Sequence, residues 1–350
     1  MKKNLNRRDF IRITAIGAGV LALGGIGLKQ LIEAGEAKTV SQTRSLLGTY
    51  VTITLADTDE AKAKNASSAA FAEIERLSAS MNRFDPASEL SILNSTGQIN
   101  NASSELIGVI QKALSYSTIT GGAYDVTMLP LQNLYQNWNW NPTASGGYIP
   151  PDDMDISAAR ELINYQNVVI NGKDITLTQQ GMGVTLDSLA PGYIVDQAAN
   201  VIRASGFSQV LIGGDSDMSL RGLRQDGTPW HLGIQDPRAL DPDSLFTAFG
   251  YTNGSIATSG DYEDAYTSDF LWNAIIDPRT GYSPQELASA TVLAPDTVTA
   301  DALSTSVMLL GVTDGLALLG SIPNVNGFLI DKNMKSYTTP GFRAATSQLE

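Results

Sequence analysis

The sequence contains no cysteine and only one histidine, His231. The absence of cysteine excludes disulfides, thiolate catalysis, zinc ribbons and iron–sulfur clusters. A Ser-His-Asp triad or a polyhistidine metal site would depend on that single histidine, which argues against both kinds of site. His231 itself belongs to an alternating strand-like segment, so we expect a strand residue rather than a catalyst. Any redox chemistry must therefore come from a bound cofactor.

Basic residues are also scarce. Lys and Arg number 23 against 36 Asp and Glu, so the formal net charge is -13 at pH 7. Such an acidic protein repels phosphate backbones, and we expect no nucleic-acid partner. An anionic ligand then needs a cation or backbone amides to hold it. The chain has 350 residues and 43% hydrophobic content, enough for a large core in one domain or in two closely packed halves.

The first forty residues are typical of an export signal. Residues 6–12 read Asn-Arg-Arg-Asp-Phe-Ile-Arg, and an apolar run covers 13–28. This pattern resembles a twin-arginine signal, and the alternative is a basic start to a transmembrane anchor. With a cleavage point after Ala37, we expect a leader over residues 1–37 and one domain over 38–350. The protein would then be periplasmic, or tethered by an uncleaved leader to the outer face of the cytoplasmic membrane.

Hydrophobic periodicity predicts a mixed fold. Residues 50–55 alternate apolar and Thr side chains like a half-buried strand, whereas 59–81 repeat apolar positions at helical spacing. Asn171-Gly172 separates two strand-like segments, as in a hairpin. We expect further helices at 105–118 and 193–204, further strands at 210–212 and 230–234, and an irregular loop at 138–153. The fold class is therefore α+β, with mixed, largely antiparallel sheets and packed helices.

Three polar clusters can carry chemistry. Asp301 and Thr305 lie one helical turn apart, so they share a face, and such hard oxygen ligands suit Mg²⁺ better than zinc. The alternative is that this pair only caps a helix. The turn Ser259-Gly260-Asp261 either cradles an oxyanion with its amides or is an ordinary turn. Arg279, after an apolar strand end at 275–277, either clamps a phosphate or lies in a solvated loop.

Together and in this order, these segments resemble the FAD:protein FMN transferases of ApbE type. The resemblance runs from Leu47 to about Gly327 and implies a flavin transferase, T-fold-like architecture. It rests on ordered motifs in the sequence, namely Leu47-Gly48-Thr49, 83–90, 121–127, Leu186-Asp187, 192–196, 258–262, 275–281 and 300–305.

The resemblance implies a flavin site that contains a metal. Asp301 and Thr305 become Mg²⁺ ligands, with a backbone carbonyl near Ser188 as a third, and the metal would rest on the FAD pyrophosphate. The implied reaction transfers FMN from FAD to a Thr or Ser hydroxyl of a target flavoprotein and releases AMP. The implied contacts to FAD are Leu47, Phe84, Ala123, Tyr124, Asp125, Asp187, Pro191 and Ile275.

Three positions depart from the family pattern. Pro191 stands where the family has lysine, Asp215-Ser216-Asp217 replaces Gly-Gly-Asp, and Ala274 replaces a histidine. Without that histidine a candidate proton acceptor is missing, and we expect Asp261 or Asp217 to serve as the catalytic residue instead. Two other functions use the same site. One is a non-catalytic FAD-binding protein, and the other is an FAD pyrophosphatase with water as the acceptor.

Overall fold

The computed structural model describes residues 38–46, 49–57, 59–137, 150–214, 216–224, 227–241 and 244–348. The expected leader, Leu47, Asp215 and most of the expected loop at 138–153 lie outside the described residues. What was predicted for them stays a prediction.

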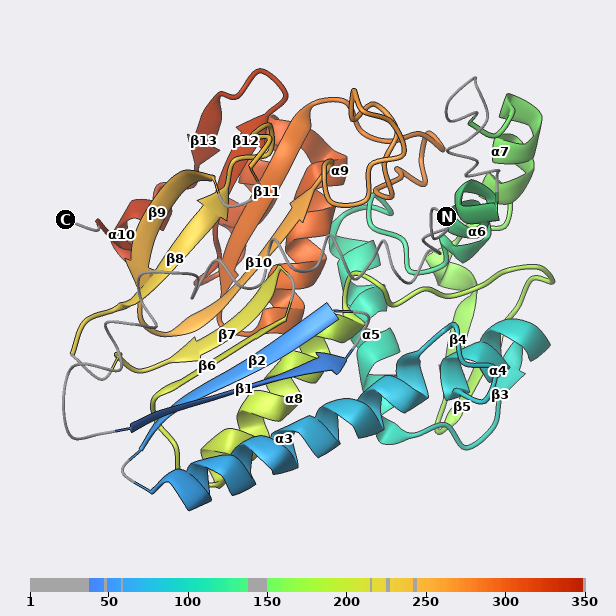
Figure 1. Ribbon diagram of the computed structural model, residues 1–350. Helices are drawn as coiled ribbons and strands as arrows, with labels where there is room; N and C mark the ends of the chain where they lie inside the picture. The colour runs from blue at the N-terminus through green and yellow to red at the C-terminus, as the bar shows by residue number, and fades with distance from the viewer. Residues whose placement is uncertain are drawn as a thin grey trace, which may run out of the picture.

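The domain is organised around an eight-stranded sheet in the order β1-β2-β6-β7-β10-β11-β12-β13 (Figure 1). All neighbouring strands in it are antiparallel, which confirms the largely antiparallel α+β fold. The strands are β1 Lys38–Leu46, β2 Thr49–Asp57, β6 Val210–Gly214, β7 Asp217–Arg221, β10 Gly254–Gly260, β11 Leu287–Ala294, β12 Asn326–Asp331 and β13 Ser336–Thr338.

The two faces of this sheet are covered by different layers, and successive residues of a strand point alternately to one layer and to the other. On β10, Ala257 packs into the core formed with the helices, whereas Ile256 packs with Trp230 and Phe249 on the other side. The helical layer contains α3 (Glu60–Met81), α8 (Ala190–Ala204) and α9 (Thr297–Ser321). The opposite layer contains β8 (Trp230–Gln235), β9 (Leu245–Tyr251), β14 (Ser347–Gln348) and α10 (Phe342–Ala345).

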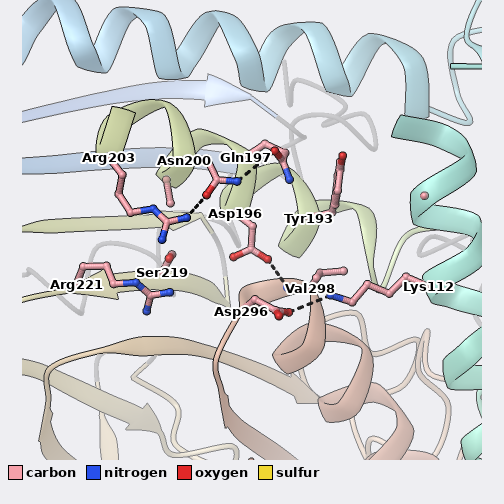
Figure 2. A pocket seen from close by; sticks show the side chains of 12 residues that line it. Lys112, Tyr193, Asp196, Gln197, Asn200, Arg203, Ser219, Arg221, Asp296 and Val298 are labelled. Atoms are coloured by element: carbon pink, nitrogen blue, oxygen red, sulfur yellow. Dashed lines mark hydrogen bonds and ion pairs between the residues drawn. The ribbon is translucent and has the colours of Figure 1, made fainter. Parts of the chain in front are cut away.

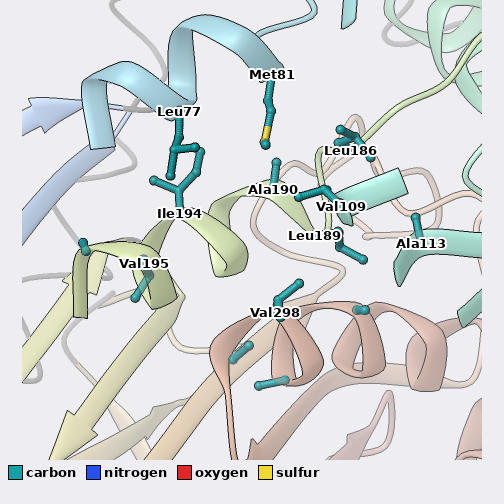
Figure 3. Close-up of a cluster of buried hydrophobic side chains, with 14 of the residues drawn as sticks. Leu77, Met81, Val109, Ala113, Leu186, Leu189, Ala190, Ile194, Val195 and Val298 are labelled. Carbon is teal, nitrogen blue, oxygen red and sulfur yellow. The ribbon is translucent and has the colours of Figure 1, made fainter. Parts of the chain in front are cut away.

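The helical layer packs through its apolar stripes. Leu77 of α3 lies against Ile194 of α8, and Met81 points toward Ala190, while Val298 of α9 lies on the other side of α8 (Figure 3). The predicted helix at 59–81 is confirmed, and it begins after Asp59, whose side chain accepts a hydrogen bond from a backbone amide in the first turn. The layer therefore fixes α8 between α3 and α9.

α9 is the central helix of the site described below. Among the described helices it alone is long and apolar enough to cross a bilayer, yet it packs inside the domain against β10, β11 and α8. Its regular conformation breaks at Gly311, whose φ of 78° lies in the left-handed region. Nη2 of Arg279 donates to the carbonyl of Leu309 at 2.8 Å, which satisfies an acceptor next to the break.

Most of a second group of elements, at the right of Figure 1, shares the helical-layer core, whereas its members α6 and α7 pack around a separate apolar cluster. The predicted hairpin around Asn171-Gly172 is confirmed there, and β5 pairs with β4 and β3. The expected loop ends where α7 begins, at Asp153, and its described residues 150–152 are irregular. The expected strand end at 275–277 is wrong, because these residues have no regular secondary structure and lead into a turn at 278–280. The elements are α4 Glu89–Thr96, β3 Gln98–Ile99, α5 Ser104–Ile119, α6 Leu129–Asn137, α7 Asp153–Arg160, η1 Tyr165–Asn167, β4 Val168–Asn171 and β5 Asp174–Leu177.

Candidate functional site

Several segments that are far apart in the sequence meet near the N-terminus of α8. They are the turn after α3, the loop between α5 and α6, the start of α6, the residues before α8 and the first half of α9. We call the polar and aromatic residues that these segments contribute the α8–α9 cluster; its members are Arg83, Phe84, Tyr124, Gln132, Asp187, Ser188, Asp301 and Thr305.

Asp301 connects α9 to α8. Its Oδ2 accepts a hydrogen bond from the amide of Gly192 at 3.2 Å, in the first turn of α8. The N-cap residue of α8, Leu189, makes no side-chain cap hydrogen bond, so Asp301 supplies an acceptor that the start of α8 otherwise lacks. α9 has its own cap, because Asp296 accepts from the amide of Thr299 at 2.9 Å. The carboxylate of Asp301 thus caps the neighbouring helix and not its own.

The environment of Asp301 disfavours a bare negative charge. Burial raises the pKa of Asp301 to about 7, and the charges of Asp196 and Asp187 add to this, while the hydrogen bond from Gly192 acts in the opposite direction. A bound divalent cation would offset the charge and lower this pKa. The carboxyl group therefore has the properties expected of a cation ligand.

Hydroxyl groups lie on the face of α9 that carries Asp301. Oγ of Ser259, on β10, lies 2.8 Å from Oγ of Ser304 and 3.1 Å from Oγ1 of Thr305. Thr305 follows Asp301 by one helical turn, as the sequence predicts. The described residues contain no group of three or more His, Cys, Asp and Glu side chains able to hold a metal. A metal here would therefore need hydroxyl and carbonyl oxygens beside one carboxylate, a donor set that fits Mg²⁺.

Tyr124 joins the α5–α6 loop to this region. Burial raises its pKa above the usual range, its hydroxyl hydrogen-bonds to Ser188, and the charge of Asp301 contributes as well. Its ring meets that of Tyr116 edge-on at 6.4 Å, and the Tyr116 hydroxyl lies 2.8 Å from Oγ1 of Thr299 on α9. The predicted residues Tyr124, Ser188 and Asp301 are thus brought together.

Asp125 orders the loop that carries Tyr124. Its Oδ1 accepts from the amide and the hydroxyl of Thr127 at 2.8 and 2.6 Å, and its Oδ2 accepts from the amide of Tyr165 at 3.1 Å. The predicted contact Ala123 is fully buried beside it. The carboxylate therefore holds the loop, and burial raises its pKa.

Arg83 and Gln132 were not predicted as site residues. Nε of Arg83 donates to both oxygens of Asp187 at 3.0 and 2.8 Å, and Nε2 of Gln132 donates to Oδ2 of Asp187 at 2.8 Å. The guanidinium of Arg83 also lies 4.1 Å from the ring centre of Phe84, which is 72% exposed. Arg83 belongs to the Arg-Phe-Asp-Pro motif, so a signal was available, whereas nothing in the sequence marks Gln132.

Gln132 carries an acceptor without a partner. Its Oε1 is buried and makes no hydrogen bond, although Nε2 on the same amide is engaged. A buried acceptor left unsatisfied costs about 1–3 kcal/mol, so a donor from a ligand at this position would be favourable. The hydroxyl and amine groups of a nucleotide are such donors, and the residues present fit one.

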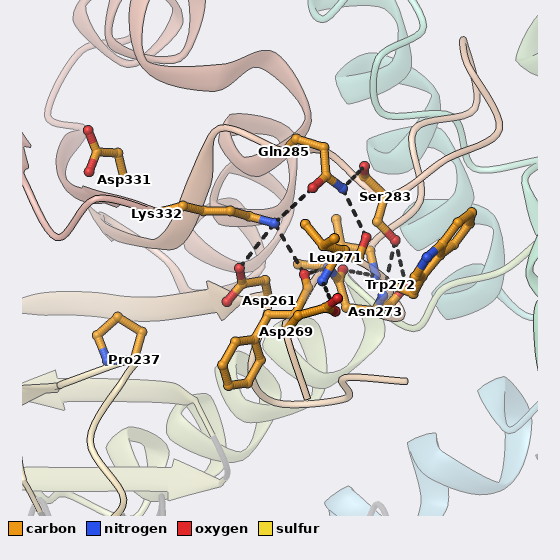
Figure 4. A network of polar contacts seen from close by, with 12 residues as sticks. Pro237, Asp261, Asp269, Leu271, Trp272, Asn273, Ser283, Gln285, Asp331 and Lys332 are labelled. Carbon is orange, nitrogen blue, oxygen red and sulfur yellow. Dashed lines mark hydrogen bonds and ion pairs between the residues drawn. The ribbon is translucent and has the colours of Figure 1, made fainter. Parts of the chain in front are cut away.

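The predicted catalytic residue Asp261 is engaged in a buried network (Figure 4). Its carboxylate accepts two hydrogen bonds from Arg238, both at 2.8 Å, and Nζ of Lys332 lies 3.4 Å from Oδ2. Its amide donates to the carbonyl of Ala288, so it does not cradle an oxyanion. Arg238 in turn lies over the ring of Phe270 at 4.3 Å. This geometry favours a structural role for Asp261.

The other predicted catalytic residue, Asp217, is buried at the start of β7, opposite Gly214. Two residues further on, Ser219 pairs with Ser255, and Oγ of Ser255 lies 2.9 Å from Oγ1 of Thr297 on α9. Because side chains alternate along a strand, Asp217 shares the face that is covered by the helices. It therefore stays a candidate.

The remaining predicted residues are placed as follows. Arg279 pairs with Asp277 at 2.7 Å and with the carbonyl of Leu309, so its guanidinium is already occupied and does not form the expected phosphate clamp. Ile275 is half-buried against the helical-layer core. Pro191 lies in the first turn of α8, where a proline is well tolerated.

Known proteins resemble this chain over most of its length. Residues 47–329 match the sequence profile of the ApbE family. A FAD:protein FMN transferase from Vibrio cholerae is 29% identical over 281 residues, which are 79% of this chain and 83% of the relative. A FAD:protein FMN transferase from Klebsiella pneumoniae is 28% identical over 351 residues, covering 95% of this chain and 97% of the relative.

Solved structures agree with this. The flavin transferase ApbE from Vibrio cholerae superposes with a TM-score of 0.76 at 28% identity, over 89% of this chain and 100% of that one. The ApbE protein from Thermotoga maritima gives a TM-score of 0.78 at 22% identity, over 89% and 100%, and supports the fold. From the matched residues and the shared fold, this chain belongs to the ApbE family.

Proposed function

We propose that this protein transfers FMN from FAD to a Thr or Ser hydroxyl of a target flavoprotein and releases AMP. The observation that carries the proposal is the α8–α9 cluster, in which Asp301 of α9 binds the start of α8, and Gln132, bonded to Asp187, keeps a buried acceptor without a partner. The curated relatives bear the name of this activity. A binding protein without turnover and an FAD pyrophosphatase become outcomes of the test below.

The proposed reaction exchanges one phosphate linkage for another. The acceptor hydroxyl oxygen attacks the phosphorus on the FMN side of the FAD pyrophosphate, and a new P–O bond forms. The bond from that phosphorus to the bridging oxygen breaks, and the bridging oxygen leaves with AMP. The hydroxyl proton passes to a base, so neither an oxidant nor a reductant is required.

Asp301, Thr305 and the backbone carbonyl near Ser188 would hold Mg²⁺, since all three offer oxygen atoms. When bound, the ion supplies positive charge that stabilises the pyrophosphate oxygens as the bridging bond breaks. The formal charge of the protein is -13, so Asp301 and its neighbours would otherwise repel an anionic nucleotide.

Other residues of the cluster bind and orient the substrate. Asp187 is held by Arg83 but remains 42% exposed, so it can accept further hydrogen bonds from ribityl or ribose hydroxyls. Oε1 of Gln132 accepts another. The exposed ring of Phe84, with the Arg83 guanidinium over it, offers a flat surface to an aromatic ring system.

Two departures from the family pattern have local substitutes in this proposal. Pro191 removes a cation, but the start of α8 still offers the positive end of a helix dipole to an anion. Ala274 removes a proton acceptor, and Asp217 is the remaining candidate because Asp261 is occupied by Arg238 and Lys332.

The test incubates the full chain with FAD, Mg²⁺ and an acceptor domain that carries an exposed Thr. We expect covalent flavin fluorescence on the acceptor in a denaturing gel and an equal amount of AMP, both abolished when that Thr is replaced by Val. Asp301→Ala should abolish transfer. Asp314→Ala is the matched control, because Asp314 lies exposed on the same helix, and it should retain activity.

Other outcomes would contradict the proposal. Free FMN with AMP and no labelled acceptor would mean hydrolysis. Stoichiometrically bound, unchanged FAD would mean a binding protein without turnover.

We also propose that the chain is exported by the twin-arginine route, on the basis of residues 6–28. Replacing both Arg7 and Arg8 with Lys should leave the protein in the cytoplasmic fraction. A matched Lys2→Arg, Lys3→Arg variant should still be exported. Unchanged export of the first variant would reject this route.

A further inference from the structure

A cavity of about 330 Å³ lies outside the α8–α9 cluster, between α5, α8, β7 and the first turn of α9 (Figure 2). No member of the cluster lines it. Its polar lining comes from one face of α8, through Tyr193, Asp196, Gln197, Asn200 and Arg203, which recur at helical spacing. The cavity is therefore a second concave site on the same helix.

Two arginines line one end of this cavity. The Arg203 side chain from α8 and the Arg221 side chain from β7 lie there on either side of Ser219 (Figure 2). Arg203 donates to the side chain of Asn200, and Arg221 donates to the carbonyls of Leu220 and Pro295, both at 3.2 Å. Within the described part of the chain, neither guanidinium forms an ion pair.

Neither carboxylate of the cavity forms an ion pair with these arginines, because each one is hydrogen-bonded elsewhere. Asp196 accepts from the amides of Thr297 and Val298 at 2.8 and 2.9 Å, at the start of α9. Asp296 pairs with Lys112 at 3.2 Å and caps α9. One end of the cavity thus carries two positive charges without a carboxylate partner, in a protein with a formal charge of -13.

We propose that this cavity binds a small oxyanion, a phosphate- or carboxylate-bearing metabolite, through Arg203 and Arg221. A guanidinium forms two parallel hydrogen bonds with either kind of anion. The hydroxyl of Ser219 lies between the two groups and adds a donor. The volume is at the lower end of that found for small-molecule sites, so the ligand is compact.

This site is separable from the flavin site. The two share α8 and α9 but no residue, and oxyanion binding requires neither a divalent metal nor FAD. The proposal therefore holds or fails independently of the proposed transferase activity.

The experiment is isothermal titration of the full chain with inorganic phosphate and, separately, with succinate, at constant ionic strength in EDTA. We expect saturable binding to one site per chain, and the tighter probe tells whether the ligand head is a phosphate or a carboxylate. The double variant Arg203→Gln, Arg221→Gln should bind at least about tenfold more weakly, since two charge-assisted contacts are lost. Arg44→Gln, which removes a surface arginine paired with Glu75, should bind like the unaltered protein.

A second variant tests the proposal independently, in case the double variant fails to fold. Gln197→Glu keeps both arginines and adds a negative charge at the cavity wall, on a half-buried helix position, so it should also weaken binding. The proposal is overturned by the absence of saturable binding for both probes, or by unchanged binding in both the double variant and Gln197→Glu.

Discussion

At the scale of single residues, Asp301 connects two helices. It sits on α9, and its Oδ2 receives the amide hydrogen bond of Gly192 on α8. Burial and the nearby carboxylates Asp196 and Asp187 make its ionised form unfavourable in the metal-free protein. The same side chain therefore contributes to helix packing and, in the proposed mechanism, to metal binding.

A pH dependence of stability follows from this. The pKa of Asp301 is raised from 3.8 to about 7 on folding, so between these values the folded state holds a proton that the unfolded state releases. In EDTA, the free energy of unfolding should therefore fall as the pH rises from about 4 to 7, by up to about 1.4 kcal/mol for each pKa unit of the shift. Asp301→Asn keeps an acceptor for Gly192 and should reduce this fall. Urea titrations over this pH range measure it, and an identical slope in the Asn variant would refute the assignment.

Arg83 is expected to act on substrate binding. Its guanidinium is nearly buried and holds both oxygens of Asp187. Arg83→Ala removes the hydrogen bonds that orient the Asp187 carboxylate. FAD binding should therefore weaken by roughly 10- to 100-fold, the loss typical of one charge-assisted hydrogen bond. Fluorescence titration of FAD measures this. Arg76→Ala is the control, because Arg76 pairs with Glu73 on the surface, and equal losses in the two variants would contradict the role of Arg83.

At the scale of elements, the contact of α8 with α9 depends on a glycine. A Cβ added at Gly192 would lie 2.7 Å from the carbonyl oxygen of Thr297 and 2.9 Å from Cα of Val298, both backbone atoms of α9. Gly192 therefore allows the close approach that brings the first turn of α8 to Asp301.

Gly192→Ala should force the two helices apart. We expect a loss of about 1–3 kcal/mol in the free energy of unfolding, together with weaker Mg²⁺ binding, because Asp301 loses its position. The control is Gly320→Ala. Gly320 lies in the last turns of α9 with open space around it, so this change should be neutral or slightly stabilising. Thermal unfolding with and without Mg²⁺ compares the two. A Gly192→Ala protein with unchanged stability and unchanged Mg²⁺ affinity would show that the close contact of α8 with α9 contributes to neither.

Elements with strong local patterns could be predicted from the sequence, and those that depend on tertiary packing could not. The long amphipathic helix at 59–81 and the hairpin around Asn171-Gly172 carry their own signals. α7 was missed because only Ile156 of its residues is buried, which leaves no apolar stripe. The apolar pair Ile275 and Ile276 predicts a strand end, but these residues have no regular secondary structure and pack into two different clusters.

The same limit applies to the site. Asp301 and Thr305 are separated by one turn of a single helix, so their shared face could be predicted. Gln132 acquires its role through Asp187, which lies 55 residues further along the chain, and through the burial of its own Oε1. No local pattern encodes such a contact.

At the scale of the whole molecule, ligand binding should raise the free energy of unfolding of the domain. The α8–α9 cluster draws residues from α3 to α9, so a ligand that binds only the folded arrangement stabilises the entire domain. FAD and Mg²⁺ together should raise Tm by several degrees, since saturation to about 100 times Kd adds about 2.7 kcal/mol. FAD in EDTA should give a much smaller rise, and Asp314→Ala should respond fully. Equal shifts with and without Mg²⁺ would exclude a joint site.

The hydrogen bond from Gly192 to Asp301 also bears on how related sequences are interpreted. A descendant that lost transferase activity would still need an acceptor at this position to hold the two helices together. Selection for folding alone would then preserve the aspartate after its chemistry had disappeared. Retention of Asp301 is thus weak evidence of activity, whereas the amide oxygen of Gln132, which makes no hydrogen bond within the fold, marks the position where loss of function should first be seen.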